Sequence, residues 1–279
     1  MWRSTPASST STDRLTGVAA AWAAMLASWR AKFLEVLAWA GAGGEFITWI
    51  VFPAFPVMII GLIYRSARPD LLGYVVVAAA ANTVAQNLTM YLTNLLDDER
   101  MNGTLVGLFL APCPRYSWLI GFTLGGIVDT IFSAFVVLGL GLLAFRVPLH
   151  PDFPALIVTA ILFLIAIGGL GFILTGLGLL LKDGGTLANL VFPIFAFLGG
   201  VWYPVSLLPI WLQIPARCLP LGYGMQALAS AALHHTGVRD LAAQLIPLVG
   251  FAIGLPILGI WMFSFVEKRI RIRGELDLY

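Results

Sequence analysis

Few side chains in this sequence have chemistry of their own, and the most isolated of them is an acid. Asp129 falls in the middle of the apolar run 116–145. A carboxylate inside a membrane is costly and by default a candidate for a functional role, such as binding a proton or a sodium ion. Pairing with an asparagine or threonine of another segment would also account for it. The sequence leaves both roles of Asp129 open.

A polar stripe runs along the otherwise apolar stretch 72–96. Its members recur at helical spacing in two neighbouring rows, with Asn82, Gln86, Thr89 and Thr93 in one row and Thr83, Asn87, Tyr91 and Asn94 in the other. A face this polar should not meet lipid. It either packs against another helix or lines a translocation path, and two adjacent rows favour the path. In 186–203, Phe192 and Phe195 would give that path an aromatic wall, with ordinary packing as the alternative.

Patterns typical of enzymes and metal sites are missing from the sequence. Cys113 and Cys218 are far apart, and His150, His234 and His235 come with no evident third ligand, so we expect no metal site and no disulfide framework. No lysine follows a glycine, so there is no Walker A loop for ATP. A His-Glu-x-x-His motif is also missing, and no histidine falls in a predicted span, which disfavours intramembrane proteases. We therefore expect no catalytic residue and no enzyme.

The composition indicates the elements that must position these residues. Of 279 residues, 59% are hydrophobic and only 11% are charged, whereas soluble domains carry about 25% charged residues. The apolar residues fall in runs of the length that crosses a bilayer as a helix, about 20 residues. Ten-residue segments with period-2 alternation, typical of outer-membrane barrels, are not found. The predicted fold class is an all-α membrane protein, and the net charge of +2 disfavours a nucleic-acid partner.

Six membrane spans are predicted, at about 45–64, 72–96, 116–145, 153–181, 186–203 and 243–266. Pro53 and Pro56 should kink the first span. Eleven of the 16 lysines and arginines fall on the side that carries both termini, so we expect both termini in the cytoplasm. The loops are short, and any soluble catalysis must therefore come from another chain.

Two segments precede the spans. Residues 1–14 are polar and are expected to be a disordered cytoplasmic N-terminus. Residues 15–40 have apolar and polar faces at helical spacing, and inserting Arg30, Lys32 and Glu35 into hydrocarbon would be costly. We therefore predict that 15–40 is an amphipathic helix lying in the membrane interface, followed by a single membrane domain over 41–279.

The segment 97–118 joins the second and third spans on the cytoplasmic side. Asp97 and Asp98 open it and could cap the N-terminus of a short surface helix, 97–110. An acidic helix end of this kind can dock into a partner, with a solvated loop end as the alternative. The residues that follow are Glu99, Arg100, Gly103, Thr104, Leu105 and Pro112.

This pattern resembles the one that follows the second span in ABC-2 type permeases of bacterial ABC exporters. Val106 departs from it, because the family often has an acid after Gly-Thr-Leu. The resemblance implies a coupling helix that seats in a groove of an ATP-binding subunit. The residues it assigns to this contact are Asp97, Asp98, Glu99, Arg100, Gly103, Thr104 and Leu105.

The stretch 199–230 contains four prolines, which rule out one continuous helix. Two half-helices that enter the outer leaflet and return would form a re-entrant hairpin between spans 5 and 6, able to gate an exit. The same stretch also resembles ABC-2 permeases, through Gly200, Tyr203, Pro204, Leu208, Pro209, Trp211, Pro220, Leu221 and Tyr223. From these we assign the outer gate to Tyr203, Pro204, Pro209, Trp211, Pro220 and Tyr223.

The resemblance implies a multi-pass permease of the bacterial cytoplasmic membrane, with no cofactor on this chain. Its partners would be membrane lipid, two ATP-binding subunits that hold MgATP, and a second permease chain, identical or homologous. The second and fifth spans would border the route at the interface of the two permeases. We expect export of an amphipathic drug or lipid-like substrate, with lipid-linked polysaccharide or glycolipid as the nearest alternative. An ion-coupled transporter using Asp129 is the remaining one, although no internal repeat is evident.

Overall fold

The computed structural model describes residues 52–101, 115–181 and 183–273, and also Leu26, Arg30 and Leu34, which are helical. The predicted disordered segment 1–14 and nearly all of the predicted interfacial helix 15–40 lie outside the described residues. Within the described residues every regular element is a helix, which confirms the all-α class. These are α3 (Phe52–Ala67), α4 (Leu72–Met101), α6 (Arg115–Phe145), α7 (Phe153–Leu181), α8 (Gly184–Leu198), α9 (Ile210–Arg217), α10 (Pro220–Leu233) and α11 (Ala242–Arg273), with the 3₁₀ turns η2 (Pro69–Leu71) and η3 (Val205–Leu207).

Four helical stretches are long and apolar enough to cross a membrane. They are Pro69–Leu95, Thr123–Phe145, Phe153–Leu181 and Ala242–Val266, and they match four of the predicted spans. The other two predicted spans, 45–64 and 186–203, correspond to shorter apolar helices, Ala54–Ala67 and Gly184–Leu198. Six complete crossings therefore remain a prediction.

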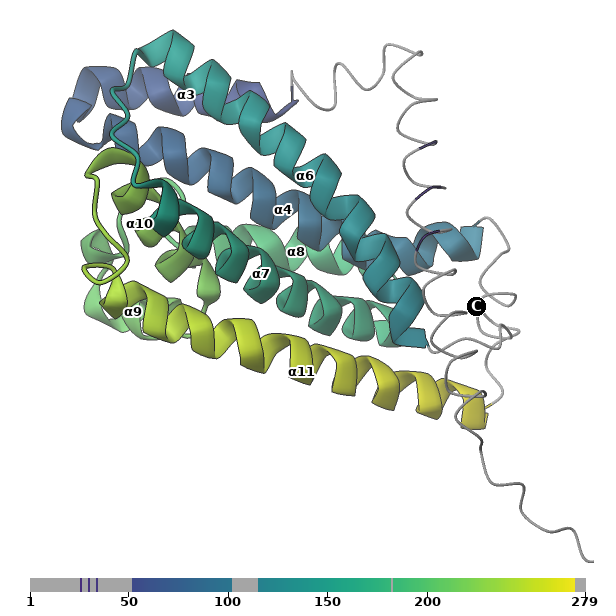
Figure 1. Cartoon of the computed structure of the whole chain (residues 1–279). Coiled ribbons are helices and arrows are strands. Elements are labelled where there is room, and N and C mark those ends of the chain that lie inside the picture. The colour runs from purple at the N-terminus through teal and green to yellow at the C-terminus, as the bar shows by residue number, and fades with distance from the viewer. Residues whose placement is uncertain are drawn as a thin grey trace, which may run out of the picture.

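Helix α4 lies at the centre of the bundle and contacts α3, α6, α7, α8 and α10. Figure 1 shows α6 crossing along one side of α4, α11 running along the opposite edge beside α7, and α9 and α10 gathered at one end. The reason is readable in the sequence of α4, since every residue from Val75 to Ala81 is buried. Small and β-branched side chains on all faces let several helices approach α4 closely.

The contact between α7 and α11 is the most extensive one among the described helices, and glycines bring the two backbones together. A Cβ atom added at Gly169 of α7 would lie 2.4 Å from the backbone nitrogen of Pro256 in α11. One added at Gly259 would lie 2.9 Å from the carbonyl oxygen of Gly169. Small residues at helix contacts are typical of membrane proteins, where close backbone approach replaces the hydrophobic driving force.

The outward faces of the long helices are apolar. Phe132, Phe135 and Leu143 of α6 are exposed, as are Ile257 and Trp261 of α11. Exposed large apolar side chains along membrane-length helices fit a surface in contact with lipid tails. The bundle thus has small residues where helix backbones approach closely and large apolar residues on its outward faces.

Candidate functional site

Helix α4 continues without interruption to Met101, so Asp97 and Asp98 lie in its last turns. The prediction that these acids cap a new helix beginning at residue 97 is therefore wrong. A capping residue must stand just before a helix with non-helical backbone angles, and both acids have helical neighbours on either side. Asp97 does satisfy a helix N-terminus, but that of another helix.

The carboxylate of Asp97 joins the end of α4 to the start of α8. Its Oδ2 accepts hydrogen bonds from the backbone N–H groups of Gly184, at 2.8 Å, and Gly185, at 3.1 Å. N–H groups in the first turn of a helix have no partner within that helix, and the helix dipole favours a negative charge there. Asp183 adds the local cap, because its Oδ1 accepts from the N–H of Thr186 at 2.8 Å. Two carboxylates thus satisfy three N–H groups of α8.

The packing around this contact leaves no room for a larger residue. A Cβ atom at Gly184 would lie 2.4 Å from the carbonyl oxygen of Thr93 in α4, and one at Gly178 of α7 would lie 2.6 Å from the Cα of Gly184. The Thr175 hydroxyl of α7 also donates to the carbonyl oxygen of Leu92 in α4, at 2.9 Å. We call this meeting point of α4, α7 and α8, made by Thr93, Asp97, Thr175, Gly184 and Gly185, the α8 junction.

Sequence reasoning did not find the α8 junction. One signal was present, because Asp183 followed by two glycines at the start of an apolar run is typical of a helix N-cap with a close neighbour. The pairing with Asp97 has no sequence signal, since 87 residues separate it from Gly184.

The other residues assigned to the coupling helix are only partly within the structure. Asp98 is exposed. Glu99 and Arg100 belong to the last turn of α4, and their side chains are outside the described set. Gly103, Thr104 and Leu105, together with Pro112, lie outside the described residues. The coupling helix therefore stays a prediction.

The polar stripe of α4 divides into buried and exposed members. Asn82, Thr83, Thr89 and Thr93 are buried within the single chain, and Thr93 donates its hydroxyl to the carbonyl oxygen of Thr89 at 2.9 Å. Burial of these residues supports the alternative of helix packing. Gln86 is exposed, while Asn87, Tyr91 and Asn94 are half-buried, so a role in the path remains a prediction for these.

The aromatic pair of α8 divides in the same way. Phe192 is only 2% exposed and belongs to the main core, whereas Phe195 is half-buried at its edge. Asp129, in α6, is half-buried and has an interaction partner within the chain. A structural role is therefore open to it, as the sequence allowed.

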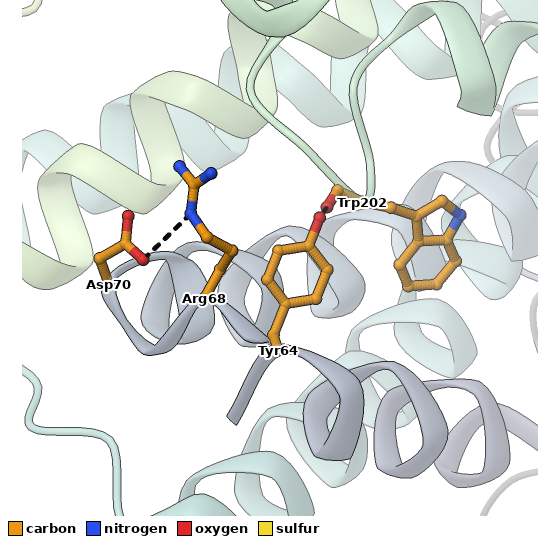
Figure 2. A network of polar contacts seen from close by, with 4 residues as sticks. All are labelled: Tyr64, Arg68, Asp70 and Trp202. Atoms are coloured by element: carbon orange, nitrogen blue, oxygen red, sulfur yellow. Dashed lines mark hydrogen bonds and ion pairs between the residues drawn. The ribbon is translucent and has the colours of Figure 1, made fainter. Parts of the chain in front are cut away.

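The far end of α8 is held by tyrosine hydroxyls. Tyr203 donates to the carbonyl oxygen of Phe197 at 2.9 Å, and Tyr74 of α4 donates to that of Gly200 at 2.9 Å. Tyr64 of α3 donates to the carbonyl oxygen of Trp202; Figure 2 shows this contact, with the Trp202 indole turned away from it. We call Tyr64, Tyr74 and Tyr203 the tyrosine clamp.

The turn after α8 needs the clamp because its backbone changes direction sharply. Gly200 has a φ of +70°, in the left-handed region that favours glycine. This turn ends α8 at Leu198, earlier than the predicted boundary at 203. Burial, and to a lesser degree the neighbouring Tyr64, raises the pKa of Tyr203. The nearby Arg68–Asp70 ion pair, at 3.4 Å, is largely exposed and contributes little (Figure 2).

The prolines of the outer hairpin lie mostly at helix starts. Pro204 and Pro209 immediately precede η3 and α9, and Pro220 is the first residue of α10, where the missing N–H does no harm. Pro215 alone lies inside a helix, the eight-residue α9. The break between two helices is thus confirmed, while their entry into the outer leaflet remains a prediction.

The two hairpin helices have opposite environments. Helix α10 packs against α4, α7 and α11, and most of its side chains are buried. On α9, Trp211 is 69% exposed beside the exposed Ile210 and Ile214. Between them lies a cavity of about 210 Å³, lined by Val205, Ser206, Gln213, Ala216, Arg217, Gly222, Tyr223 and Gln226. Of the residues assigned to the gate, Tyr223 is the member that lines it.

Comparison with protein families identifies the family of this chain. The family model for the ABC-2 type transporter matches residues 21–233. The chain belongs to the ABC-2 type transporter family. The match covers both stretches on which the resemblance was noticed, the one from Glu99 to Pro112 and the one from Gly200 to Tyr223. The comparison with curated proteins gave no match.

Membership of the ABC-2 family fixes the general role of the chain. Such a domain is the transmembrane component of an ABC transporter, and it is not itself an ATPase. ABC-2 permeases typically work with an ATP-binding subunit. Together with the apolar helices, the family identifies this chain as a membrane protein.

Proposed function

We propose that this chain is the permease subunit of an ATP-driven exporter that moves an amphipathic drug or lipid-like substrate out of the cytoplasm or inner leaflet. ATP is hydrolysed on a separate subunit, present in two copies, and the energy reaches the permease through the segment at 97–110. Residues Asp98, Glu99, Arg100, Gly103, Thr104 and Leu105 make that contact. Both termini lie in the cytoplasm.

The observation that carries this proposal is the α8 junction. The segment 97–110 overlaps the last turns of α4, so a displacement of the segment moves the Asp97 carboxylate. That carboxylate holds the first two N–H groups of α8, and Gly184 touches the backbone of α4. A movement at the ATPase contact is therefore passed directly to α8. ATP drives such a change because the two states of the complex bind it with different affinity.

A second permease chain completes the unit. One face of α8 is exposed and apolar through Leu190, Ile194 and Phe197, with Thr186 and Asn189 towards its start. Packing of this face and of the exposed Gln86 against a second permease would place the route between two chains. Movement of α8 would then change that interface.

The test is to co-express the chain with the ATPase encoded beside it, reconstitute the complex in lipid and measure vanadate-sensitive ATP hydrolysis. The substrate panel contains amphipathic drugs, phospholipids and lipid-linked saccharides. We expect a stable complex whose hydrolysis rises with one class, and a saccharide response would name the alternative cargo.

Variants make this test specific for coupling. Asp97→Asn should lower substrate stimulation while leaving complex assembly intact, and Asp240→Asn, at an exposed aspartate before α11, is the matched control. Unchanged stimulation in Asp97→Asn would refute transmission through the α8 junction. Failure to assemble with any ATPase, together with an ion-driven flux lost in Asp129→Asn, would refute the exporter itself.

A further inference from the structure

The cavity between α9 and α10 has a lining suited to a ligand of defined charge. Its volume is about 210 Å³, below the roughly 300–1,000 Å³ of pockets that enclose drug-sized ligands. It therefore accepts a headgroup rather than a whole amphiphile. Its polar lining residues are Ser206, Gln213, Arg217, Tyr223 and Gln226.

The charge of this lining is positive. Arg217 contributes a guanidinium, and none of the eight lining residues is an acid. Ser206, Tyr223 and Gln226 supply hydroxyl and amide donors, while Gln213 has one amide hydrogen committed to the carbonyl oxygen of Leu208, at 2.8 Å. An arginine with neutral donors around it is the arrangement that binds phosphate or carboxylate oxygens.

An exposed apolar surface adjoins the cavity. On α9, Gln213 and Arg217 line the cavity, while Ile210 and Ile214 lie on the neighbouring face and are exposed, as is Trp211. In helical projection this apolar face lies next to the cavity face, because Arg217 stands three residues after Ile214 and seven after Ile210. A ligand with an anionic head and an apolar tail would cover both surfaces at once.

We propose that this cavity binds the phosphate of an anionic phospholipid, with Arg217 as its charged ligand and the acyl chains lying along Ile210, Trp211 and Ile214 of α9. A free phosphate would fill only the cavity and leave the apolar face exposed. A zwitterionic lipid would bring a cation to a lining that has no acid to receive it. This site lies within one chain, and its existence does not depend on the direction or cargo of transport.

The experiment is native mass spectrometry of the full-length chain in detergent, titrated with phosphatidylglycerol or with phosphatidylcholine of the same acyl chains. Arg217→Gln removes the charge, and Arg239→Gln, an exposed arginine in the turn before α11, is the matched control. Since bonds to charged groups are the strong ones, we expect Arg217→Gln to weaken phosphatidylglycerol binding about tenfold or more. Arg217→Lys should retain part of the affinity, and Arg239→Gln should match wild type.

Two further arms separate the lipid from its phosphate. In wild type, inorganic phosphate should displace phosphatidylglycerol only in large excess. Ile214→Ser should weaken phosphatidylglycerol binding and leave the affinity for inorganic phosphate unchanged, so that less phosphate is needed to displace the lipid. Equal binding of the two lipids, or equal losses in Arg217→Gln and Arg239→Gln, would overturn the site. Displacement by inorganic phosphate at concentrations equal to those of the lipid would overturn its assignment to a phospholipid.

Discussion

The two ends of α8 are held by opposite chemistry. At its start, the carboxylate of Asp97 accepts two N–H groups. At and beyond its end, the hydroxyls of Tyr203, Tyr74 and Tyr64 each donate to a carbonyl oxygen. Asp97 matches the N–H groups that a helix leaves unpaired at its N-terminus, and Tyr203 donates to a carbonyl in the last turn, where a helix leaves carbonyls unpaired. Tyr74 and Tyr64 bond carbonyls of the turn beyond α8. Because Asp97 and Tyr74 both belong to α4, one helix holds α8 at both ends.

The two ends of α8 differ in how many groups hold them and in the charge of those groups. The α8 junction depends on one charged group that serves two donors, in packing that tolerates no added atom. The tyrosine clamp spreads its contacts over α3, α4 and the turn after α8, and each donor is neutral. We therefore expect a single substitution at the α8 junction to lower the free energy of unfolding strongly. Each substitution in the tyrosine clamp should lower it by a smaller, additive amount.

The largest effect should come from Gly184→Ala. The added methyl would meet the carbonyl oxygen of Thr93 at 2.4 Å, and a backbone atom cannot move aside without shifting α4. Overpacking of this kind costs about 1–3 kcal/mol, and separating the helices would also break the bonds to Asp97. We expect the free energy of unfolding to fall by about 3 kcal/mol, measured as a lower melting temperature in detergent.

The control for this substitution is Gly139→Ala in α6. A Cβ atom there has nothing within 4 Å, so the variant should be as stable as wild type or better by about 0.5–1 kcal/mol. Equal stability of the two variants would contradict the tight contact at the junction.

Next in size is Asp97→Ala, which leaves the N–H groups of Gly184 and Gly185 without their acceptor. Loss of a charged acceptor should lower the free energy of unfolding by about 2–3 kcal/mol. Asp98→Ala, at an exposed neighbour, should change it by less than about 1 kcal/mol. If thermal melts showed that Asp98→Ala is the more destabilising variant, Asp98 rather than Asp97 would be the charged acceptor at the start of α8.

Removing the Tyr74 hydroxyl with Tyr74→Phe should have a smaller effect, about 1 kcal/mol, because one neutral hydrogen bond is lost. Combining it with Tyr64→Phe tests whether the clamp works in steps. We expect the two losses to add within about 0.5 kcal/mol. A loss in the double variant much larger than the sum of the two single losses would show that Tyr74 and Tyr64 act cooperatively.

The smallest effect is expected from Tyr203→Phe, whose hydrogen bond to Phe197 is exposed. Since the pKa of Tyr203 is raised on folding, the neutral hydroxyl contributes fully below the unfolded value of about 10. That contribution is lost as the pH rises through the folded value. The stability difference between wild type and Tyr203→Phe should therefore stay constant near neutral pH and change only in alkaline solution.

The sequence predicted the helices far better than their contacts. The span 153–181 coincides with α7, because hydrophobicity over a bilayer's length is a local property. Carboxylate capping at Asp97 was also foreseen, but for the wrong helix. Periodicity identifies the polar face of a helix and not the neighbour that this face meets, and 126 residues separate Tyr74 from Gly200.

The residues that line the cavity could not be brought together from the sequence either. Tyr223 attracted notice through a family pattern, whereas Arg217, Gln213 and Gln226 had no such mark. Their association depends on the angle between α9 and α10, which prolines permit but do not set. Burial of Thr89 and Phe192 was likewise hidden, because a polar stripe and an aromatic pair fit a packed interior as well as a path.

The length of α8 has a consequence for how the protein is made. Its 15 residues rise about 22 Å, less than the roughly 30 Å of a hydrocarbon core. Because α4 precedes α8 in the chain, both partners of α8 have been synthesised when α8 leaves the ribosome. They are Asp97, which accepts from its first turn, and Tyr74, which donates to the turn beyond it. A helix shorter than a hydrocarbon core can therefore be held at both of its ends by a membrane-length helix that precedes it in the chain.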